Sequence, residues 1–395
     1  MKESVNNTYH VAVCGGGFAG ISAALAAARA GKRVVLFEKQ YMLGGLGTAG
    51  LVTIYLPICD GLGHQVCFGI AEELFRLSIT YGAESRYPEN WLDGIGTRGA
   101  EDKRFQVQYN AQVFAILAEK LLSDAGVDIM YGSYVVDTEV NENRITRLFV
   151  EGKSGRTAYG VQSVVDATGD CDIAWFAGAP TETLEVGNVL AAWYYYTDEN
   201  GYRLQMLGAA DISEEEKEKC LQLGKPISAK RFTGLDAAEI SEFVQLSHQK
   251  TLEHWLEKRE TNKSAVISTL ATIPQFRMTR KICGEYTLTL QEEHTYFEDS
   301  IGMIPNWRKR GPIYEVPFRS LYSKTVKNLI TAGRCVSTDQ ALWDIMRVIP
   351  CCAVTGQAAG TAAAMTDDIS TIDVGALQRI LQENGVILHE KEILA

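Results

Sequence analysis

Residues 9–38 read YHVAVCGGGFAGISAALAAARAGKRVVLFE, and this stretch decides the fold. The apolar and β-branched run over residues 9–14 predicts a buried parallel strand. It leads directly into a GxGxxG sequence at residues 15–20, and the alanine-rich segment over residues 21–30 predicts a helix. Residues 34–38 then predict a second strand that ends in a glutamate. The order strand, glycine turn, helix and strand is that of a dinucleotide-binding βαβ unit.

Each glycine of this turn has a physical purpose in such a unit. Gly15 permits the tight turn from strand to helix, and Gly17 lets the backbone approach a pyrophosphate. Gly20 lets the helix pack closely on the strand, and the helix N-terminus favours the phosphate charge. Glu38 ends the second strand, where a carboxylate accepts hydrogen bonds from both ribose hydroxyls. A glutamate there disfavours NADP.

The composition is that of an ordinary globular protein large enough for two lobes. The chain has 395 residues, of which 46% are hydrophobic and 22% charged, with a formal net charge of −11. The negative charge argues against nucleic-acid and anionic-membrane partners. The nine cysteines form no CxxC pair, no His/Cys cluster has metal-ligand spacing, and no apolar stretch is long enough to span a membrane. These features predict a cytoplasmic protein with reduced thiols and no bound metal.

The chain continues with the elements of a nucleotide-binding domain. Residues 41–50 are rich in glycine, which indicates either backbone lying against a flat ligand or a flexible loop. Residues 110–125 predict an amphipathic helix and residues 127–130 a further parallel strand. Residues 134–165 alternate like an antiparallel meander, and the sequence DATGD at residues 166–170 follows it. Small residues there leave free backbone beside a cofactor.

The C-terminal part returns to this domain. Residues 328–332 predict an apolar strand, followed by Gly333 and Arg334. Pro350 predicts a helix start, and the small residues up to Met365 predict close packing on the first βαβ unit. We therefore predict a discontinuous domain made of residues 1–180 and 320–395.

The segment between these parts, residues 181–319, has a different character. It contains the aromatic run at residues 193–196, an acidic helix near residues 213–222 and an amphipathic helix over residues 236–260. No second GxGxxG occurs in it. The segment is predicted to be an inserted α+β substrate domain.

The chain resembles the FAD-dependent oxidoreductases of the glutathione-reductase-like superfamily, on the glycine turn with Glu38, the DATGD stretch, Ala332-Gly333-Arg334 and the ending from Arg347 to Gly360. The resemblance implies an α/β fold: a Rossmann-like FAD-binding domain with a parallel sheet and a β-meander, plus the inserted domain. It departs from the disulfide reductases, because the second nucleotide domain and the CxxC are missing. The residues expected to bind FAD are Gly15, Gly17, Phe18, Ala19, Gly20, Glu38, Lys39, Gly44, Gly45, Leu46, Thr48, Val136, Ala167, Thr168, Gly169, Gly333, Arg334, Arg347 and Ala353.

Candidate catalytic groups lie in the inserted segment. Arginine suits a carboxylate or polyol through its forked donors, and histidine or tyrosine can move the proton that accompanies a hydride. Two alternatives stay open: the arginines pair with Glu285 and Asp299, or the tyrosines belong to a core strand. The candidates are Arg277, Arg280, His294, Tyr194 and Tyr196.

These features together predict an FAD-dependent dehydrogenase or oxidase. Its substrate is expected to be a small polar molecule, such as a hydroxylated or carboxylated ring compound. A flavin-dependent C=C reductase with an external electron donor and a non-catalytic flavoprotein subunit remain alternatives. A protein electron acceptor is compatible with each reading.

Overall fold

The computed structural model describes residues 2–81, 107–208 and 227–394. The chain forms two compact units. Unit 1 consists of Met1–Thr48, Thr53–Glu182 and Arg280–Ala395, and unit 2 consists of Ala49–Val52 and Thr183–Thr279. Residues 280–319, predicted above as part of the inserted domain, belong to unit 1. The reason is that β16 (Ser300–Pro305) from this stretch packs against α9 (Ile349–Met365).

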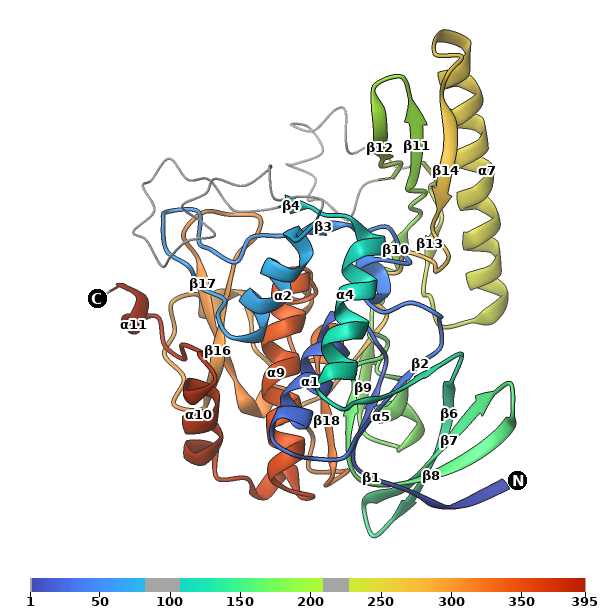
Figure 1. The fold of residues 1–395 in the computed structure, drawn as a ribbon. Coiled ribbons are helices and arrows are strands. Elements are labelled where there is room, and N and C mark those ends of the chain that lie inside the picture. The colour runs from blue at the N-terminus through green and yellow to red at the C-terminus, as the bar shows by residue number, and fades with distance from the viewer. Residues whose placement is uncertain (1, 82–106, 209–226, 395) are drawn as a thin grey trace. The chain divides into compact units, whose positions relative to one another are not determined.

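Unit 1 is built around a seven-stranded sheet with the order β5-β2-β1-β8-β7-β6 and β18 on β8 (Figure 1). Its parallel part joins β5, β2, β1, β8 and β18, whereas β6, β7 and β8 form an antiparallel meander. Strand β8 belongs to both parts, so the meander grows directly out of the central sheet. The strands are β1 (Lys2–Cys14), β2 (Val34–Glu38), β5 (Asp128–Tyr131), β6 (Tyr134–Asn141), β7 (Arg144–Gly152), β8 (Gly155–Asp166) and β18 (Leu329–Thr331).

Two helices of small residues pack against each other and against this sheet. Helix α1 (Phe18–Arg29) lies beside α9, although more than three hundred residues separate them in the chain (Figure 1). A Cβ on Gly356 would lie 2.3 Å from the carbonyl oxygen of Ala19, and one on Gly360 would lie 2.1 Å from that of Ala23. The helix backbones are therefore in direct contact, which confirms the predicted packing of the C-terminal helix on the first βαβ unit.

The remaining elements of unit 1 surround this core. Helix α4 (Ala111–Asp124) begins after Asn110, whose side chain accepts hydrogen bonds from two backbone N–H groups of the first turn. The others are β3 (Ile54–Tyr55), α2 (Ile70–Ile79), β4 (Val107–Gln108), α5 (Asp172–Phe176), β9 (Thr181–Thr183), β15 (Arg280–Ile282), β17 (Ile313–Pro317), α8 (Gln340–Met346), α10 (Val374–Glu383) and α11 (Lys391–Leu394).

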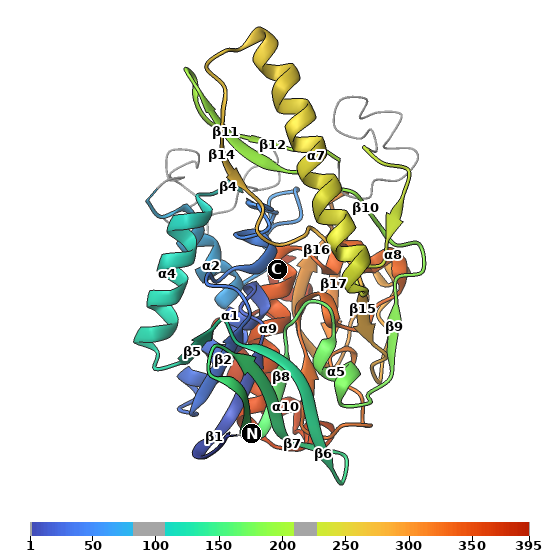
Figure 2. The same cartoon turned by 90° about the vertical axis from the view of Figure 1, so that its right-hand side faces the viewer.

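Unit 2 combines short antiparallel strands with one long helix. Strand β11 (Tyr194–Asp198) pairs with β12 (Gly201–Gln205) on one side and with β14 (Val266–Leu270) on the other. A second pair joins β10 (Asn188–Val189) and β13 (Arg231–Phe232). Helix α7 (Ala237–Thr261) begins after Asp236, which caps it, as the pattern over residues 236–260 predicts (Figure 2). The predicted acidic helix at residues 213–222 lies outside the described residues.

Within the described part of the chain, no single helix is long and apolar enough to cross a membrane. The pair α8 and α9 meets that test together, by length and composition, across a bend of 89°.

Candidate functional site

The glycine turn joins β1 to α1 at the carboxyl edge of the parallel sheet. A Cβ on Gly20 would lie 1.8 Å from the carbonyl oxygen of Gly15, so only glycine fits there. A Cβ on Gly17, in contrast, would meet no protein atom within 4 Å. Gly17 is the N-cap of α1, and the first-turn N–H groups of a helix have no partner within that helix. The turn thus leaves open space at a site suited to an anion.

Glu38 lies beside this turn and is buried, with 5% of its surface exposed. Its Oε2 accepts a hydrogen bond of 2.7 Å from the N–H of Gly16, and its Oε1 accepts one of 2.7 Å from that of Gln40. Each carboxylate oxygen has two lone pairs, so each keeps an acceptor position for a ligand hydroxyl. The carboxylate is held in place by the backbone before any ligand binds.

The segments around Gly44 and Thr48 support the same turn. The N–H of Gly44 donates to the carbonyl of Gly16 at 2.8 Å, and a Cβ on Gly45 would lie 3.2 Å from the Cα of Gly17. Thr48 is fully buried and its hydroxyl donates to the carbonyl of Leu43 at 2.5 Å. The glycine-rich residues 41–50 were predicted to be either backbone lying against a flat ligand or a flexible loop. In the structure, Gly44 and Gly45 pack on the glycine turn.

Several other predicted cofactor residues are core residues of unit 1 in this structure. Phe18 is 4% exposed and its ring stacks on Phe114 with the centroids 4.5 Å apart. Ala19, Ala167 and Ala353 are also buried. Lys39 is exposed on the surface, and its ammonium lies 5.5 Å from the ring centroid of Tyr134. Leu46 and Val136 are half-buried.

The C-terminal residues predicted to bind the cofactor already hold protein partners. Gly333 donates its N–H to the hydroxyl of Thr355 at 2.9 Å. Arg334 lies 3.5 Å from Asp170 and fills the space beside Gly169, where a Cβ would lie 2.2 Å from its guanidinium. Arg347 is paired with Asp344. These contacts fix the loops around the glycine turn.

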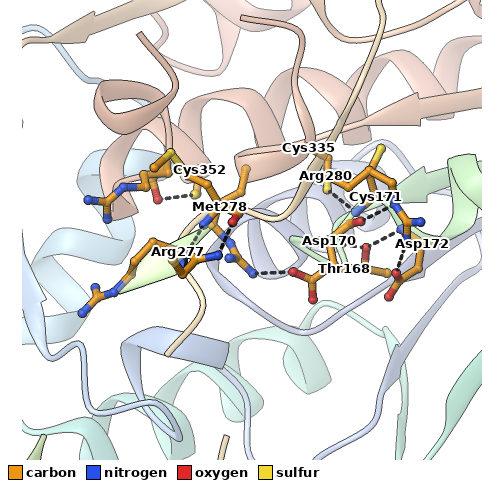
Figure 3. Close-up of polar contacts among 12 residues, drawn as sticks. Thr168, Asp170, Cys171, Asp172, Arg277, Met278, Arg280, Cys335 and Cys352 are labelled. Carbon is orange, nitrogen blue, oxygen red and sulfur yellow. Dashed lines mark hydrogen bonds and ion pairs between the residues drawn. The ribbon is translucent and has the colours of Figure 1, made fainter. Parts of the chain in front are cut away.

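A cluster of carboxylates follows β8 (Figure 3). Asp166 is fully buried and accepts hydrogen bonds from the N–H groups of Ile173 and Ala174 at 2.9 and 3.0 Å, so it caps α5. Thr168 donates both its hydroxyl, at 2.7 Å, and its N–H, at 3.1 Å, to the other oxygen of Asp166. Burial raises the pKa of Asp166. Its two oxygens are thus occupied by protein donors.

Arg280 belongs to this cluster. Its Nη2 donates to Asp172 at 2.8 Å and its Nε donates to the carbonyl of Asp170 at 3.1 Å (Figure 3). Burial, followed by the charges of Asp170 and Asp166, raises the pKa of Asp172 to about 6. The predicted alternative, in which the arginines pair with Glu285 and Asp299, is wrong for Arg280. Glu285 pairs with Lys324 and Asp299 with Arg319, so Arg280 is instead held by Asp172.

Arg277 is only three residues away in sequence but belongs to unit 2. It is 6% exposed, and its guanidinium lies 4.9 Å from the ring centroid of Trp193. Its Nη2 donates to the side chain of Gln275 at 3.3 Å. The two candidate arginines therefore have different surroundings: Arg280 contacts a carboxylate and Arg277 an aromatic ring.

The two predicted tyrosines lie on β11, as the core-strand alternative expects. Tyr194 is fully buried, and its hydroxyl lies 2.9 Å from Nδ1 of His254 on α7. Burial raises the pKa of Tyr194 to about 12 and lowers that of His254. Tyr196 is 7% exposed, with the ammonium of Lys258 3.5 Å from its hydroxyl.

His294 lies in unit 1, apart in the chain from the other candidates. Its side chain is 49% exposed and its Nδ1 lies 2.7 Å from Glu390. Its backbone has a φ of 58°, which is uncommon for a residue other than glycine. The structure places Arg280 and His294 in one unit and Arg277, Tyr194 and Tyr196 in the other.

Buried thiols form a group that motif spacing does not reveal. Cys171 and Cys335 lie with Asp166 in a set of side chains whose ligand atoms are all within 4.8 Å of one another. Burial raises the pKa of the Cys171 thiol. Asp166 and Cys171 lie five residues apart in the chain, and only the tertiary structure brings Cys335 to them. In the described residues, eight cysteines are free thiols.

The comparison with known families decides the identity of this arrangement. A family model described as FAD dependent oxidoreductase matches residues 10–192 and 190–381. The chain belongs to the FAD-dependent oxidoreductase family. It is therefore an enzyme whose cofactor is FAD, and the resemblance inferred from the motifs is confirmed.

Solved structures similar to this oxidoreductase include enzymes of several reaction types. A p-nitrophenol 4-monooxygenase from Pseudomonas putida is 14% identical, with a TM-score of 0.46, over 97% of this chain and 84% of that one. A geranylgeranyl bacteriochlorophyll reductase-like protein from Thermoplasma acidophilum is 14% identical, with a TM-score of 0.45, over 96% and 82%. A 3-ketosteroid-Δ4-(5α)-dehydrogenase from Rhodococcus jostii is 15% identical, with a TM-score of 0.43, over 91% and 98%.

The residues of unit 1 fit FAD. The open space at Gly17 would suit the pyrophosphate, because the helix dipole at the N-terminus of α1 favours negative charge. The remaining lone pairs of Glu38 would suit the two hydroxyls of the adenosine ribose.

Proposed function

We propose that this oxidoreductase transfers a hydride between a small substrate and FAD, and that the substrate, rather than a nicotinamide, exchanges the electrons. The substrate is a hydroxylated or carboxylated ring compound. FAD supplies the two-electron chemistry, through N5 of its ring. The chain's own residues bind the substrate, orient it and move the proton.

The pairing of strands in unit 2 carries this proposal. A dinucleotide-binding unit needs parallel strands joined by a helix with a glycine turn. In the described residues of unit 2, every strand pair is antiparallel: β10 with β13, and β11 with β12 and β14. This arrangement supports a substrate-binding role for unit 2 and offers no second cradle for a pyrophosphate within the described part.

Two groups of unit 2 are assigned roles under this proposal. Arg277 binds a carboxylate or hydroxyl of the substrate, because its planar fork offers two parallel donors. His254 exchanges the proton, since its lowered pKa keeps the imidazole neutral at pH 7. Tyr194 positions His254 through their 2.9 Å hydrogen bond.

Anaerobic mixing with each class of reductant tests the proposal. The purified yellow protein is mixed in a stopped-flow instrument with NADH, with NADPH and with a panel of hydroxylated and carboxylated ring compounds. We expect the flavin absorbance to bleach with a member of the panel and to persist with both nicotinamides.

Two outcomes would contradict the proposal. Bleaching by NADH or NADPH within seconds would favour a reductase supplied by a nicotinamide. Failure of the whole panel, combined with rapid oxidation of chemically reduced flavin by unsaturated ring compounds, would favour C=C reduction. His254→Gln serves as a second probe, because loss of the pH dependence of turnover with unchanged FAD content separates proton transfer from folding.

A further inference from the structure

Unit 2 has an open cavity of about 350 Å³ that the proposed mechanism does not use. Its walls come from three segments of the same unit: residues 191–193 just before β11, one face of α7, and the stretch from Leu270 to Gln275. All the lining residues in the described part of the chain belong to unit 2.

The face of α7 toward the cavity carries polar groups in helical register. Val244, Ser247, His248 and Thr251 follow one another at intervals of three, one and three residues, so they share one side of the helix. Thr251 is 4% exposed. Thr251 is thus buried beside the cavity, whereas Ser247 is half-buried and His248 is exposed.

Hydrogen bonds hold the walls apart at fixed positions. Ser247 donates its hydroxyl to the carbonyl of Ala191 at 2.8 Å, which ties α7 to the opposite wall. Trp193 donates its ring N–H to the carbonyl of Gly208 at 3.1 Å. Thr272 donates its N–H to the carbonyl of Ala49 at 2.9 Å, and Gln275 donates its side-chain amide to that of Gly50. These four hydrogen bonds join segments of unit 2 to one another and fix the walls of the cavity.

The lining residues define the chemistry of that ligand. Among the residues that the structure describes, no Asp, Glu, Lys or Arg lines the cavity, and Arg277 contacts Trp193 without being part of the wall. A charged ligand would lose its hydration there without gaining an ionic partner. Trp193, Phe243 and Pro274 offer flat apolar surfaces, and His248 and Thr251 offer hydrogen-bonding groups.

We propose that unit 2 is a binding site for a neutral compound of one or two rings that carries a hydroxyl or carbonyl group. The size agrees with this class, since an engineered cavity of about 150 Å³ holds one benzene molecule. Pockets for small molecules in proteins start at about 300 Å³. This inference concerns equilibrium binding in unit 2 and stands independently of the proposed reaction.

Calorimetric titration of the FAD-loaded protein with two matched probes tests the proposal. 2-Naphthol is neutral and carries one hydroxyl, whereas 2-naphthalenesulfonate has the same rings with a permanent charge. We expect 2-naphthol to bind and the sulfonate to bind at least tenfold more weakly. Equal or tighter binding of the sulfonate, or no binding of 2-naphthol, would overturn the proposal.

A cavity-filling variant locates the binding. Val244→Trp places an indole in the cavity and is expected to weaken 2-naphthol binding at least tenfold. Leu252→Trp is the matched control, because Leu252 lies on the same helix but is 51% exposed. FAD content reports folding for both variants. If Val244→Trp fails to fold, Ala271→Leu fills part of the same space, and wild-type affinity in the folded filling variant would place the binding elsewhere and overturn the proposal.

Discussion

The glycine turn of unit 1 and the cavity of unit 2 are two ways of making room for a ligand. At the turn, the backbone itself leaves the space: Gly17 opens outward while Gly20 touches the carbonyl of Gly15. In unit 2, side chains line the space, and hydrogen bonds from Ser247 and Trp193 hold the walls. A backbone site accepts one ligand class and tolerates few substitutions, whereas a side-chain site changes its ligand when its lining residues change.

This difference explains why the cofactor is evident while the reaction is not. The backbone features of a dinucleotide turn are common to a family, and the family shares FAD. A shared fold and cofactor do not fix the substrate, which depends on the side chains of the site. Substitutions on each side of this comparison should therefore have effects of different kinds.

The largest effect is expected at the point of closest backbone contact. Gly20→Val would force a branched side chain against the carbonyl of Gly15, where even a Cβ would lie at 1.8 Å. Overpacking of this kind costs at least about 3 kcal/mol. Little soluble, FAD-containing protein should be recovered, as measured by the ratio of flavin to protein absorbance and by thermal unfolding. A stable yellow variant would show that the turn is not rigid.

A smaller and more selective effect is expected for Gly17→Val, at the N-cap of α1. A Cβ on Gly17 would meet no protein atom within 4 Å, and the extended backbone there, with φ −71° and ψ −178°, is one that valine adopts. The apoprotein should fold normally, while the side chain occupies the space meant for the pyrophosphate. FAD affinity should fall at least about 100-fold, or about 2.7 kcal/mol. Equilibrium FAD titration measures this, and unchanged affinity would move the cofactor away from the turn.

The protonation of Asp172, in the carboxylate cluster of unit 1, should change the stability of the protein with pH. The pKa of Asp172 is about 6 in the folded protein against an ordinary value of 3.8, so between these values the folded state binds more protons than the unfolded state. The free energy of unfolding should therefore decrease as pH rises from about 4 to about 6, by roughly 1–3 kcal/mol from this group. The charges that face Asp172 are those of Asp166, Asp170, Lys39 and Arg280.

Asp172→Asn is the comparison for this prediction. Urea unfolding of the wild type and the variant, at a series of pH values from 4 to 7, gives the difference between their stabilities. That difference should shift in favour of the variant as the pH rises. A constant difference would mean that Asp172 has the same pKa folded and unfolded.

The smallest effects are expected for lysine substitutions of Arg277 and Arg280. The two variants should differ in kind, because one should lose stability and the other turnover. Arg280→Lys loses the second donor to the Asp170–Asp172 segment, which should cost about 1 kcal/mol of stability. Arg277→Lys should leave stability and FAD content unchanged but lower turnover with the substrate found by the anaerobic panel. Equal losses of FAD in both variants would make both arginines structural.

Much of unit 1 follows from short-range patterns. The first strand, the helix after the glycine turn and the meander over residues 134–165 all form as the sequence predicts, because each depends on local periodicity or on a glycine. Asn110 and Asp236 mark helix starts through their own side chains. The helix after Gly17 begins three residues earlier than residue 21, since the turn itself supplies its N-cap.

The candidate catalytic groups follow from sequence much less well. Residue type and spacing made both Arg277 and Arg280 candidates, but a unit boundary falls between Thr279 and Arg280. Asp172, the partner of Arg280, is far away in the chain, and sequence spacing does not report such pairs. Thr251 on α7 is buried, but polar residues on a helix are normally exposed, so the sequence does not reveal it.

The sequence by itself determined the dinucleotide turn and the glutamate beside it, because these act through the backbone of neighbouring residues. It also indicated that α9 packs on the first βαβ unit, because small side chains allow close contact between helices. Only the tertiary structure decided which carboxylate holds Arg280, that Tyr194 meets His254, and that unit 2 has an open cavity. Those features arise where side chains from distant segments approach one another. Their distances depend on how whole elements pack, and no local pattern contains that information.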